Sequence, residues 1–264
     1  MRALITGAAS GIGRAVAARM VSDAARSGGV AKLMLVDVAT DKLETAAREL
    51  RAEGGQIEVA VGDLGDPEVP QRVVDAAAKA FGGRMDALIS NAGIIQRGTL
   101  LELGVEDYDR CFAVNTRATW LLAKSAYPLL KQCRGCIVAT ASISAHHPTP
   151  PLGAYSASKI ALQMLVRQMA VDFGPDGIRC NTVSPGSTHT AMTDARYSDP
   201  VQRAAAAQRN PLHMVGSPEN QAAVICFLAS PAAAYVTGTD VLVDGGLSTM
   251  LMPASSFGDP WKNS

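Results

Sequence analysis

Apolar residues along this chain form short runs that alternate with longer stretches of helical spacing. The short runs predict seven β-strands, at 3–6, 32–38, 57–63, 86–92, 136–142, 179–185 and 240–246. The longer stretches predict α-helices at 11–25, 41–53, 67–81, 105–131, 155–173 and 218–229. Most strand runs are almost continuously apolar, which is typical of strands buried on both faces of a parallel sheet. The alternation therefore predicts an α/β, doubly wound parallel sheet with helices on both faces.

The chain shows no sign of a division into parts. No linker rich in Pro, Gly or Ser interrupts the alternation, and no internal repeat is visible. We therefore expect a single domain over residues 1–264. Three segments lie outside the alternation: a Pro-rich loop at 143–153, a stretch at 187–217 with a short helical pattern, and the tail at 249–264.

Composition and charge argue against several classes of protein. Lys and Arg number 24, as do Asp and Glu, so no excess of positive charge favours nucleic acid or an anionic membrane. No apolar run is long enough to cross a membrane, and the first residues enter a strand pattern without a signal peptide. We therefore expect a cytoplasmic protein.

Pairs of cysteine and histidine give only weak signals of metal or redox chemistry. The five cysteines are scattered and odd in number, which argues against a disulfide framework. Cys133 and Cys136 have a spacing that suits redox or metal chemistry, but no second ligand pair accompanies them. His146 and His147 likewise lack a neighbouring carboxylate or a third histidine. We therefore predict no metal site.

A glycine-rich turn follows the first predicted strand and opens the first predicted helix. In TGAASGIG (6–13), Gly7, Gly11 and Gly13 permit a tight turn. They also let backbone N–H groups approach a pyrophosphate, which the positive end of the helix attracts. The G-x-x-x-G-x-G spacing is weak evidence alone, because an ordinary loop turn can show it. Its place between a strand and a helix predicts a dinucleotide site.

An acid at the end of the second predicted strand bears on the choice of dinucleotide. Asp37 follows the glycine turn at about the distance expected for a carboxylate that binds a ribose 2′-hydroxyl and repels a 2′-phosphate. The nearby positions Ser10 and Val38 supply no positive charge. The sequence therefore predicts NAD as the cofactor rather than NADP. Arg14 and Lys42 are the cations that could reverse this preference.

Four polar residues form a second candidate site. Tyr155 and Lys159 stand four residues apart in a helical pattern, so they project from one face of the helix. A nearby ammonium lowers the pKa of a phenol, which would suit Tyr155 to act as general acid and base. Ser142, at the end of the fifth predicted strand, can hydrogen-bond a substrate oxygen. Asn115 is unusual inside a predicted helix and indicates a local kink or a bound water.

Each of these residues has a purely structural explanation when it is taken alone. Y-x-x-x-K is a common spacing, Ser142 could cap a strand end, and Asn115 could be solvated. Their joint occurrence, in this order and on these elements, favours catalysis. The alternative is a non-catalytic NAD(H)-binding sensor or scaffold, which needs the glycine turn but has no need of the four polar residues.

Together with the glycine turn, these residues resemble the short-chain dehydrogenase/reductase family. The matching motifs are TGAASGIG (6–13), Asp63, NAG (91–93), Asn115, Ser142, YSASK (155–159), PGSTHT (185–190) and the closing VLVDGG. The resemblance implies a Rossmann-type sheet of about seven strands and NAD(P)-dependent alcohol dehydrogenase or ketone reductase activity. The chain departs from the family pattern at Ser90, where Asn is usual, and at Ala145, where Gly is frequent.

The resemblance also implies roles for particular residues. Catalysis would use Asn115, Ser142, Tyr155 and Lys159, with Tyr155 as the general acid and base, Lys159 lowering its pKa and Asn115 positioning a relay water. The cofactor would contact Gly7, Ser10, Gly11, Ile12, Gly13, Asp37, Asp63, Leu64, Asn91, Ala92, Gly93, Tyr155, Lys159, Pro185, Gly186, Thr188 and Thr190. The resemblance further implies a homotetramer, or a dimer, that pairs the helices at 105–131 and 155–173.

The wall of the substrate site is expected in the segments outside the alternation. In the loop 143–153, the candidates are Ser144, His147 and Leu152, and Arg97 could meet an anionic group. We expect the stretch 187–217 to act as a substrate lid, with the candidates His189, Met192, Tyr197, His213 and Met214. This mixture is consistent with a small to medium secondary alcohol or ketone and does not identify the substrate.

Overall fold

The computed structural model describes residues 1–250, which contain one parallel sheet of seven strands. The strands are β1 (Arg2–Thr6), β2 (Lys32–Asp37), β3 (Gln56–Val61), β4 (Ala87–Ser90), β5 (Cys136–Thr140), β6 (Arg179–Pro185) and β7 (Asp240–Val243). Their order across the sheet is β3-β2-β1-β4-β5-β6-β7, and every neighbouring pair is parallel. The predicted α/β, doubly wound fold of the Rossmann type is confirmed.

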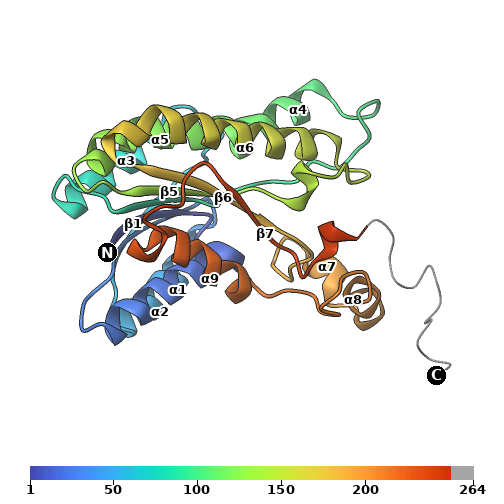
Figure 1. Cartoon of the computed structure of the whole chain (residues 1–264), viewed down its shortest axis with the longest axis horizontal. Helices are drawn as coiled ribbons and strands as arrows, with labels where there is room; N and C mark the ends of the chain where they lie inside the picture. The colour runs from blue at the N-terminus through green and yellow to red at the C-terminus, as the bar shows by residue number, and fades with distance from the viewer. Residues whose placement is uncertain (251–264) are drawn as a thin grey trace.

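Helices cover both faces of this sheet. They are α1 (Gly11–Arg26), α2 (Thr40–Ala52), α3 (Val69–Phe81), α4 (Val105–Phe112), α5 (Ala118–Lys131), α6 (Gly153–Phe173), α7 (Asp194–Tyr197), α8 (Pro200–Ala207) and α9 (Pro218–Ala229). Helices α3, α5 and α6 lie on one face, and α1, α2 and α9 lie on the other (Figure 1). The short helices α7 and α8 lie to one side of these layers (Figure 1).

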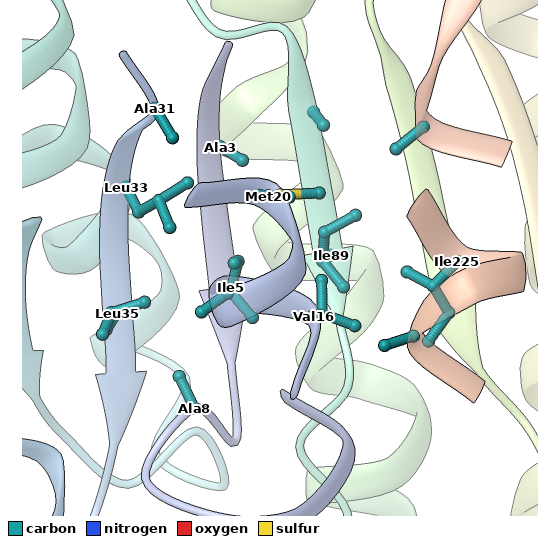
Figure 2. Close-up of a cluster of buried hydrophobic side chains, with 14 of the residues drawn as sticks. Ala3, Ile5, Ala8, Val16, Met20, Ala31, Leu33, Leu35, Ile89 and Ile225 are labelled. Carbon is teal, nitrogen blue, oxygen red and sulfur yellow. The ribbon is translucent and has the colours of Figure 1, made fainter. Parts of the chain in front are cut away.

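Each face of the sheet has its own hydrophobic core. In β1, Ile5 points into the cluster beneath α1 and α9, where it joins Val16 and Ile225 (Figure 2). The adjacent residue Leu4 belongs to the cluster on the other face, which includes Leu122 of α5. Since successive side chains of a strand point to opposite faces, a strand covered by helices on both sides must be apolar throughout. This requirement explains the continuous apolar runs of the sequence.

One predicted helix is divided in the structure. The stretch 105–131 forms α4, then a π-helical turn at Ala113–Arg117, and then α5. π-Helical turns are rare and are frequently found at functional sites. This turn contains Asn115, so the local kink that the sequence indicated at this residue is present.

Several predicted strands are shorter in the structure than in the sequence pattern. The segments predicted at 86–92 and 136–142 end as strands at Ser90 and Thr140. The residues that follow each of these strands leave the sheet and line a cavity. The carboxyl ends of the strands therefore form the boundary of a binding site. The predicted domain runs to residue 264, and its last part, 251–264, lies outside the described residues.

Candidate active site

A cavity of about 550 Å³ lies at the carboxyl ends of the strands. Ligands bind at this edge in open α/β sheets, where the strand order changes direction. All of the predicted catalytic and cofactor-binding residues line it except Gly13 and Asn115. Residues from the first glycine turn, from the ends of the central strands, from α6 and from the segment after β6 thus meet around one space.

The glycine turn is shaped to admit a phosphate group. Gly7 and Gly11 have φ angles of +64° and +54°, which favour glycine. A Cβ atom on Gly13 would lie 2.2 Å from the carbonyl oxygen of Gly7, so only glycine lets α1 begin this close to β1. No acidic residue lies in the first turn of α1, whose positive end opens beside the cavity. These features fit a pyrophosphate, as the sequence predicts.

Asp37 ends β2 with its carboxylate held by two backbone donors. The amide of Ala9 donates to Oδ2 at 3.0 Å, and the amide of Ala39 donates to Oδ1 at 3.1 Å. Each oxygen keeps a lone pair on the cavity rim that a ribose hydroxyl can use. Arg14, one of the two cations that could change the cofactor preference, forms an ion pair with Glu49.

Asp63 is engaged within the chain. Its carboxylate pairs with Arg110 at 2.8 Å and accepts a hydrogen bond of 2.9 Å from the amide of Gly65. The Arg110 guanidinium holds the pKa of this carboxyl below its usual value. Asp63 therefore caps the turn after β3, and it lines the cavity at the same time.

Asn91 joins the ends of three strands. Its side-chain nitrogen donates to the carbonyl oxygen of Thr6 at 3.2 Å, and its Oδ1 accepts from the hydroxyl of Thr140 at 3.0 Å. The backbone amides of Asn91 and Ala92 both donate to the hydroxyl of Thr6 at 3.0 Å. Asn91 thereby fixes the spacing of β1, β4 and β5, and the small residues after it keep the cavity open.

Tyr155 and Lys159 project from the first turns of α6, as their spacing predicts. The Nζ atom of Lys159 lies 5.7 Å from the centroid of the Tyr155 ring. Lys159 is buried, and its ammonium donates to the carbonyl oxygen of Thr140 at 2.7 Å. The aromatic hydroxyl and the ammonium thus line the same cavity, next to the carboxyl end of β5.

The electrostatics of this pair differ from the expectation in one respect. Burial raises the pKa of Tyr155, and a hydrogen bond with Ser142 opposes this rise. Burial also lowers the pKa of Lys159 to about 8. The predicted lowering of the Tyr155 pKa by Lys159 is therefore not found in the chain by itself, because the loss of hydration on burial outweighs the opposing hydrogen bond with Ser142.

Ser142 lies just beyond β5 and begins a 3-10 turn at Ile143–Ala145. Its hydroxyl accepts a hydrogen bond of 3.1 Å from the amide of Ser144, and it also contacts the hydroxyl of Tyr155. It lines the cavity. A hydroxyl in this position can hold a substrate oxygen beside the phenol.

Asn115 lies behind the cavity wall. Its Oδ1 accepts from the amide of Ile94 at 2.8 Å, and its Nδ2 donates to the carbonyl oxygen of Ile94 and to the hydroxyl of Ser158, both at 3.0 Å. Both side-chain hydrogens are therefore used within the chain. A Cβ atom on Gly93 would come within 3.3 Å of both Asn115 Oδ1 and Lys159 Nζ. Asn115 thus braces the segment after β4 against α6.

The candidate substrate residues divide into two groups. Ser144 and Leu152 of the loop 143–153 line the cavity formed by residues 1–250, as do Met192 and Tyr197 of the stretch 187–217. The remaining candidates do not line it: Arg97, His147, His189, His213 and Met214.

Three arginines of the cavity were not identified from the sequence. Arg110 pairs with Asp63, whereas Arg196 and Arg209 extend from the segment 187–217. The side chains of these two make no ion pair or hydrogen bond with another residue in 1–250. Arginines in polar helical segments carry no sequence signal that separates them from solvated surface residues, so only the folded chain reveals them.

The weaker signals of the sequence mark no other site in the described part of the chain. Residues 1–250 contain no cluster of three side chains that could hold a metal ion. The five cysteines are not joined by disulfide bonds, and Cys136 is buried. Within the same residues, no helix has both the length and the apolar character needed to cross a membrane.

Comparison with known proteins identifies the family. A family model described as enoyl-(acyl carrier protein) reductase matches residues 7–248. The chain is 34% identical to the uncharacterised oxidoreductase YxbG of Bacillus subtilis (strain 168), covering 98% of this chain and 96% of that one. It matches the structure of a short-chain type dehydrogenase/reductase from Mycobacterium ulcerans with a TM-score of 0.86 at 31% identity, covering 96% of this chain and 92% of that one. The chain belongs to the short-chain dehydrogenase/reductase family.

Short-chain dehydrogenases/reductases are oxidoreductases that act on CH–OH groups with a nicotinamide cofactor. A short-chain dehydrogenase from Burkholderia cenocepacia J2315 was solved in complex with NADP. The present chain matches it with a TM-score of 0.83 at 33% identity, covering 94% of this chain and 97% of that one. Membership of the family therefore fits the glycine turn and the Ser142–Tyr155–Lys159 cluster of the cavity.

Proposed function

We propose that this protein transfers a hydride between a nicotinamide cofactor, preferably NAD, and a small to medium secondary alcohol or ketone. The observation that carries the proposal is that Ser142, Tyr155 and Lys159 share one cavity with the phosphate-binding glycine turn. A module that only sensed NAD(H) would need the turn but not this cluster.

A nicotinamide cofactor bound at the glycine turn would supply the hydride for reduction or take it up in oxidation. As a phenolate, Tyr155 takes the alcohol proton during oxidation and becomes a phenol. In the reverse direction the phenol gives this proton to the carbonyl oxygen. Ser142 donates a hydrogen bond to the same substrate oxygen. Lys159, held on the carbonyl oxygen of Thr140, places a positive charge beside the phenol. The phenol becomes more acidic when an oxidised, cationic nicotinamide also lies next to it.

Asn115 supports this cluster indirectly in our proposal. Because its side-chain hydrogens are used by Ile94 and Ser158, the side chain fixes the π-helical turn against α6. A relay water beside Lys159 would then be held by the backbone of this turn. This use of Asn115 differs from a direct contact with cofactor or substrate.

The preference for NAD is supported by the charges around the adenosine end of the cavity. The carboxylate of Asp37 would repel a 2′-phosphate, while it can accept a hydrogen bond from a 2′-hydroxyl. Arg14 is paired with Glu49 and so is less available to neutralise a phosphate. The relative from Burkholderia cenocepacia was solved with NADP, so our preference for NAD comes from the charges of this rim and not from membership of the family.

The other end of the cavity carries positive charge. The acids on the cavity wall, Asp37 and Asp63, are both held by donors at the adenosine end. Arg196 and Arg209 line the wall near the lid and have no carboxylate partner within residues 1–250. We propose that the segment 187–217 covers the substrate and that its arginines favour a substrate with an anionic group.

We also propose that α5 and α6 pair between subunits in a homotetramer or dimer. Trp120 of α5 and Ile160, Met164 and Val171 of α6 expose between 44% and 70% of their surface. Apolar side chains gathered on one exposed face are typical of protein contact surfaces.

A substrate screen tests the proposed function. Secondary alcohols and ketones, with and without a carboxylate or phosphate, are offered with NAD(H) or NADP(H), and the absorbance of the reduced nicotinamide is followed. We expect turnover with NAD and a lower KM for anionic substrates, which rises about tenfold or more in Arg196→Ala. Tight NADH binding without turnover of any substrate would favour the sensor. Faster turnover with NADP would contradict the assignment of Asp37.

A further inference from the structure

The side chain of His146 connects the loop after Ser142 to a buried acid on the edge strand. His146 follows the 3-10 turn at Ile143–Ala145, and its Nε2 lies 2.7 Å from Oδ2 of Asp240, the first residue of β7. The Asp240 side chain is only 4% exposed, and that of His146 is 31% exposed. These residues are 94 positions apart in the chain, so the contact depends on the complete fold.

Asp240 is held rigidly by strand β6. Its Oδ1 accepts hydrogen bonds from the hydroxyls of Thr182 at 2.6 Å and Ser184 at 2.9 Å. With His146 on Oδ2, three donors surround one carboxylate. A buried carboxylate is costly unless it is hydrogen-bonded or paired in this way. The sheet therefore presents a fixed acceptor to the imidazole.

The same imidazole also contacts the helix that carries Tyr155 and Lys159. Gln163 lies one helical turn after Lys159 and is 1% exposed. Its side-chain amide lies 3.0 Å from Nε2 of His146 and 3.0 Å from the hydroxyl of Ser184. Because the Ser184 hydroxyl donates its one hydrogen to Asp240, it accepts from the amide nitrogen of Gln163. Gln163 thus connects α6 to the same group of side chains.

The turn between Ser142 and His146 connects the His146–Asp240 contact to the Ser142 hydroxyl. The amide of Ala145 donates to the carbonyl oxygen of Ser142, and the amide of His146 donates to that of Ile143, both at 3.0 Å. The amide of Ser144 donates to the Ser142 hydroxyl at 3.1 Å. Residues 142–146 thus form one hydrogen-bonded unit, in which a shift at one end displaces the other.

We propose that His146 is a positioning residue for the reaction. By binding Asp240, with Gln163 packed beside it, the imidazole of His146 keeps the Ser142 hydroxyl next to the Tyr155 hydroxyl. This proposal rests on the proposed function, since it gives Ser142 the task of holding the substrate oxygen. His146 does not line the cavity and so acts through Ser142. Displacements near 1 Å can lower turnover by about 100-fold.

Three variants test this proposal in the full-length protein. We expect His146→Ala to lower kcat about tenfold or more, with the KM for the nucleotide unchanged within about twofold, because the glycine turn is untouched. His146→Gln should recover most of the activity, since its amide can still donate to Asp240. His147→Ala is the matched control and should behave as the parent does, because the His147 side chain makes no hydrogen bond or ion pair with Asp240 or Gln163.

A second measurement does not depend on turnover. Hydrogen exchange of the backbone amides of 144–146 should accelerate about tenfold or more in His146→Ala and remain unchanged in His147→Ala. If the amides of 144–146 exchange slowly in the parent but the parent has no dehydrogenase activity, the proposed function fails. The role of His146 in fixing this turn would still stand. Parent-like kcat and exchange in His146→Ala would overturn the proposal, as would equal losses in His147→Ala. If His146→Ala does not fold, the folded variants His146→Gln and Asp240→Asn test the proposal instead. Parent-like kcat and exchange in Asp240→Asn would overturn the proposal. Losses in Asp240→Asn together with recovery in His146→Gln would support it.

Discussion

Raising the pH from about 7.5 to about 9.5 should stabilise the cofactor-free protein through Lys159. This side chain is 3% exposed, and burial lowers its pKa from 10.5 to about 8. Between these two values the unfolded chain binds a proton at Lys159 that the folded chain has released. Stability therefore increases with pH in this window, because the unfolded state carries more protons there.

The size of the effect follows from the difference in pKa. Integration of proton binding between about pH 7.5 and about pH 9.5 gives a contribution on the order of 2 kcal/mol from this one group. Burial raises the pKa of Cys136 to about 11, so its thiol acts in the opposite direction once the pH rises toward 9. A comparison between the parent and Lys159→Met cancels the contributions of groups that both proteins share.

Urea unfolding of both proteins across this pH range measures the contribution. The free energy of unfolding of the parent should rise relative to Lys159→Met by about 2 kcal/mol, and Lys124→Met, which removes a surface lysine, should follow the parent. Parallel pH curves for the parent and Lys159→Met would refute the reasoning, since they would mean that the ammonium is as well solvated in the folded chain as in the unfolded one.

Three further predictions concern the cavity. Tyr155→Phe should retain NADH binding, and its kcat should fall between about 10²- and 10⁴-fold. Tyr235→Phe, which changes an exposed tyrosine, is the control. Activity within about tenfold of the parent would contradict the acid–base assignment. Asp37→Ser should lower the ratio of kcat/KM for NAD to that for NADP by about tenfold or more, and an unchanged ratio would place the discrimination elsewhere. Gly13→Ala should lower the free energy of unfolding by about 2 kcal/mol or more, because the new Cβ atom would overlap the carbonyl oxygen of Gly7. Thermal or urea unfolding measures this change. Unchanged stability would show that α1 can shift.

The sequence allowed the sheet and the cofactor end of the site to be predicted because their signals are local. A buried parallel strand needs apolar residues on both faces, so the run around Ile5 is informative without knowledge of its neighbours. The glycine turn likewise needs its residues at fixed short spacings. Tyr155 and Lys159 are linked by the period of one helix. Each of these inferences uses residues that remain close in the folded chain for reasons of backbone geometry alone.

The remaining features depend on contacts between residues far apart in the chain. The π-helical turn at Ala113–Arg117 accompanies hydrogen bonds from Asn115 to Ile94, 21 positions earlier. The partner of Asp63 is Arg110, 47 positions later. No periodicity connects such pairs, because the loops between them set their distances. The same limit applied to the pKa of Tyr155, for which the sequence shows the neighbouring ammonium but not the burial that opposes it.

These long-range pairs also decide which charges of the cavity can respond to a substrate. Asp63 is paired with Arg110, Asp37 is held by two backbone amides, and Lys159 is held on a carbonyl oxygen, so their positions are fixed before any ligand binds. Such fixed groups can hold a cofactor and the reacting atoms in one arrangement. Arg196 lies in α7 and Arg209 follows α8, and neither is fixed by a comparable partner within residues 1–250. In the function proposed above, substrate choice therefore depends on that segment, while the fixed groups carry out the reaction.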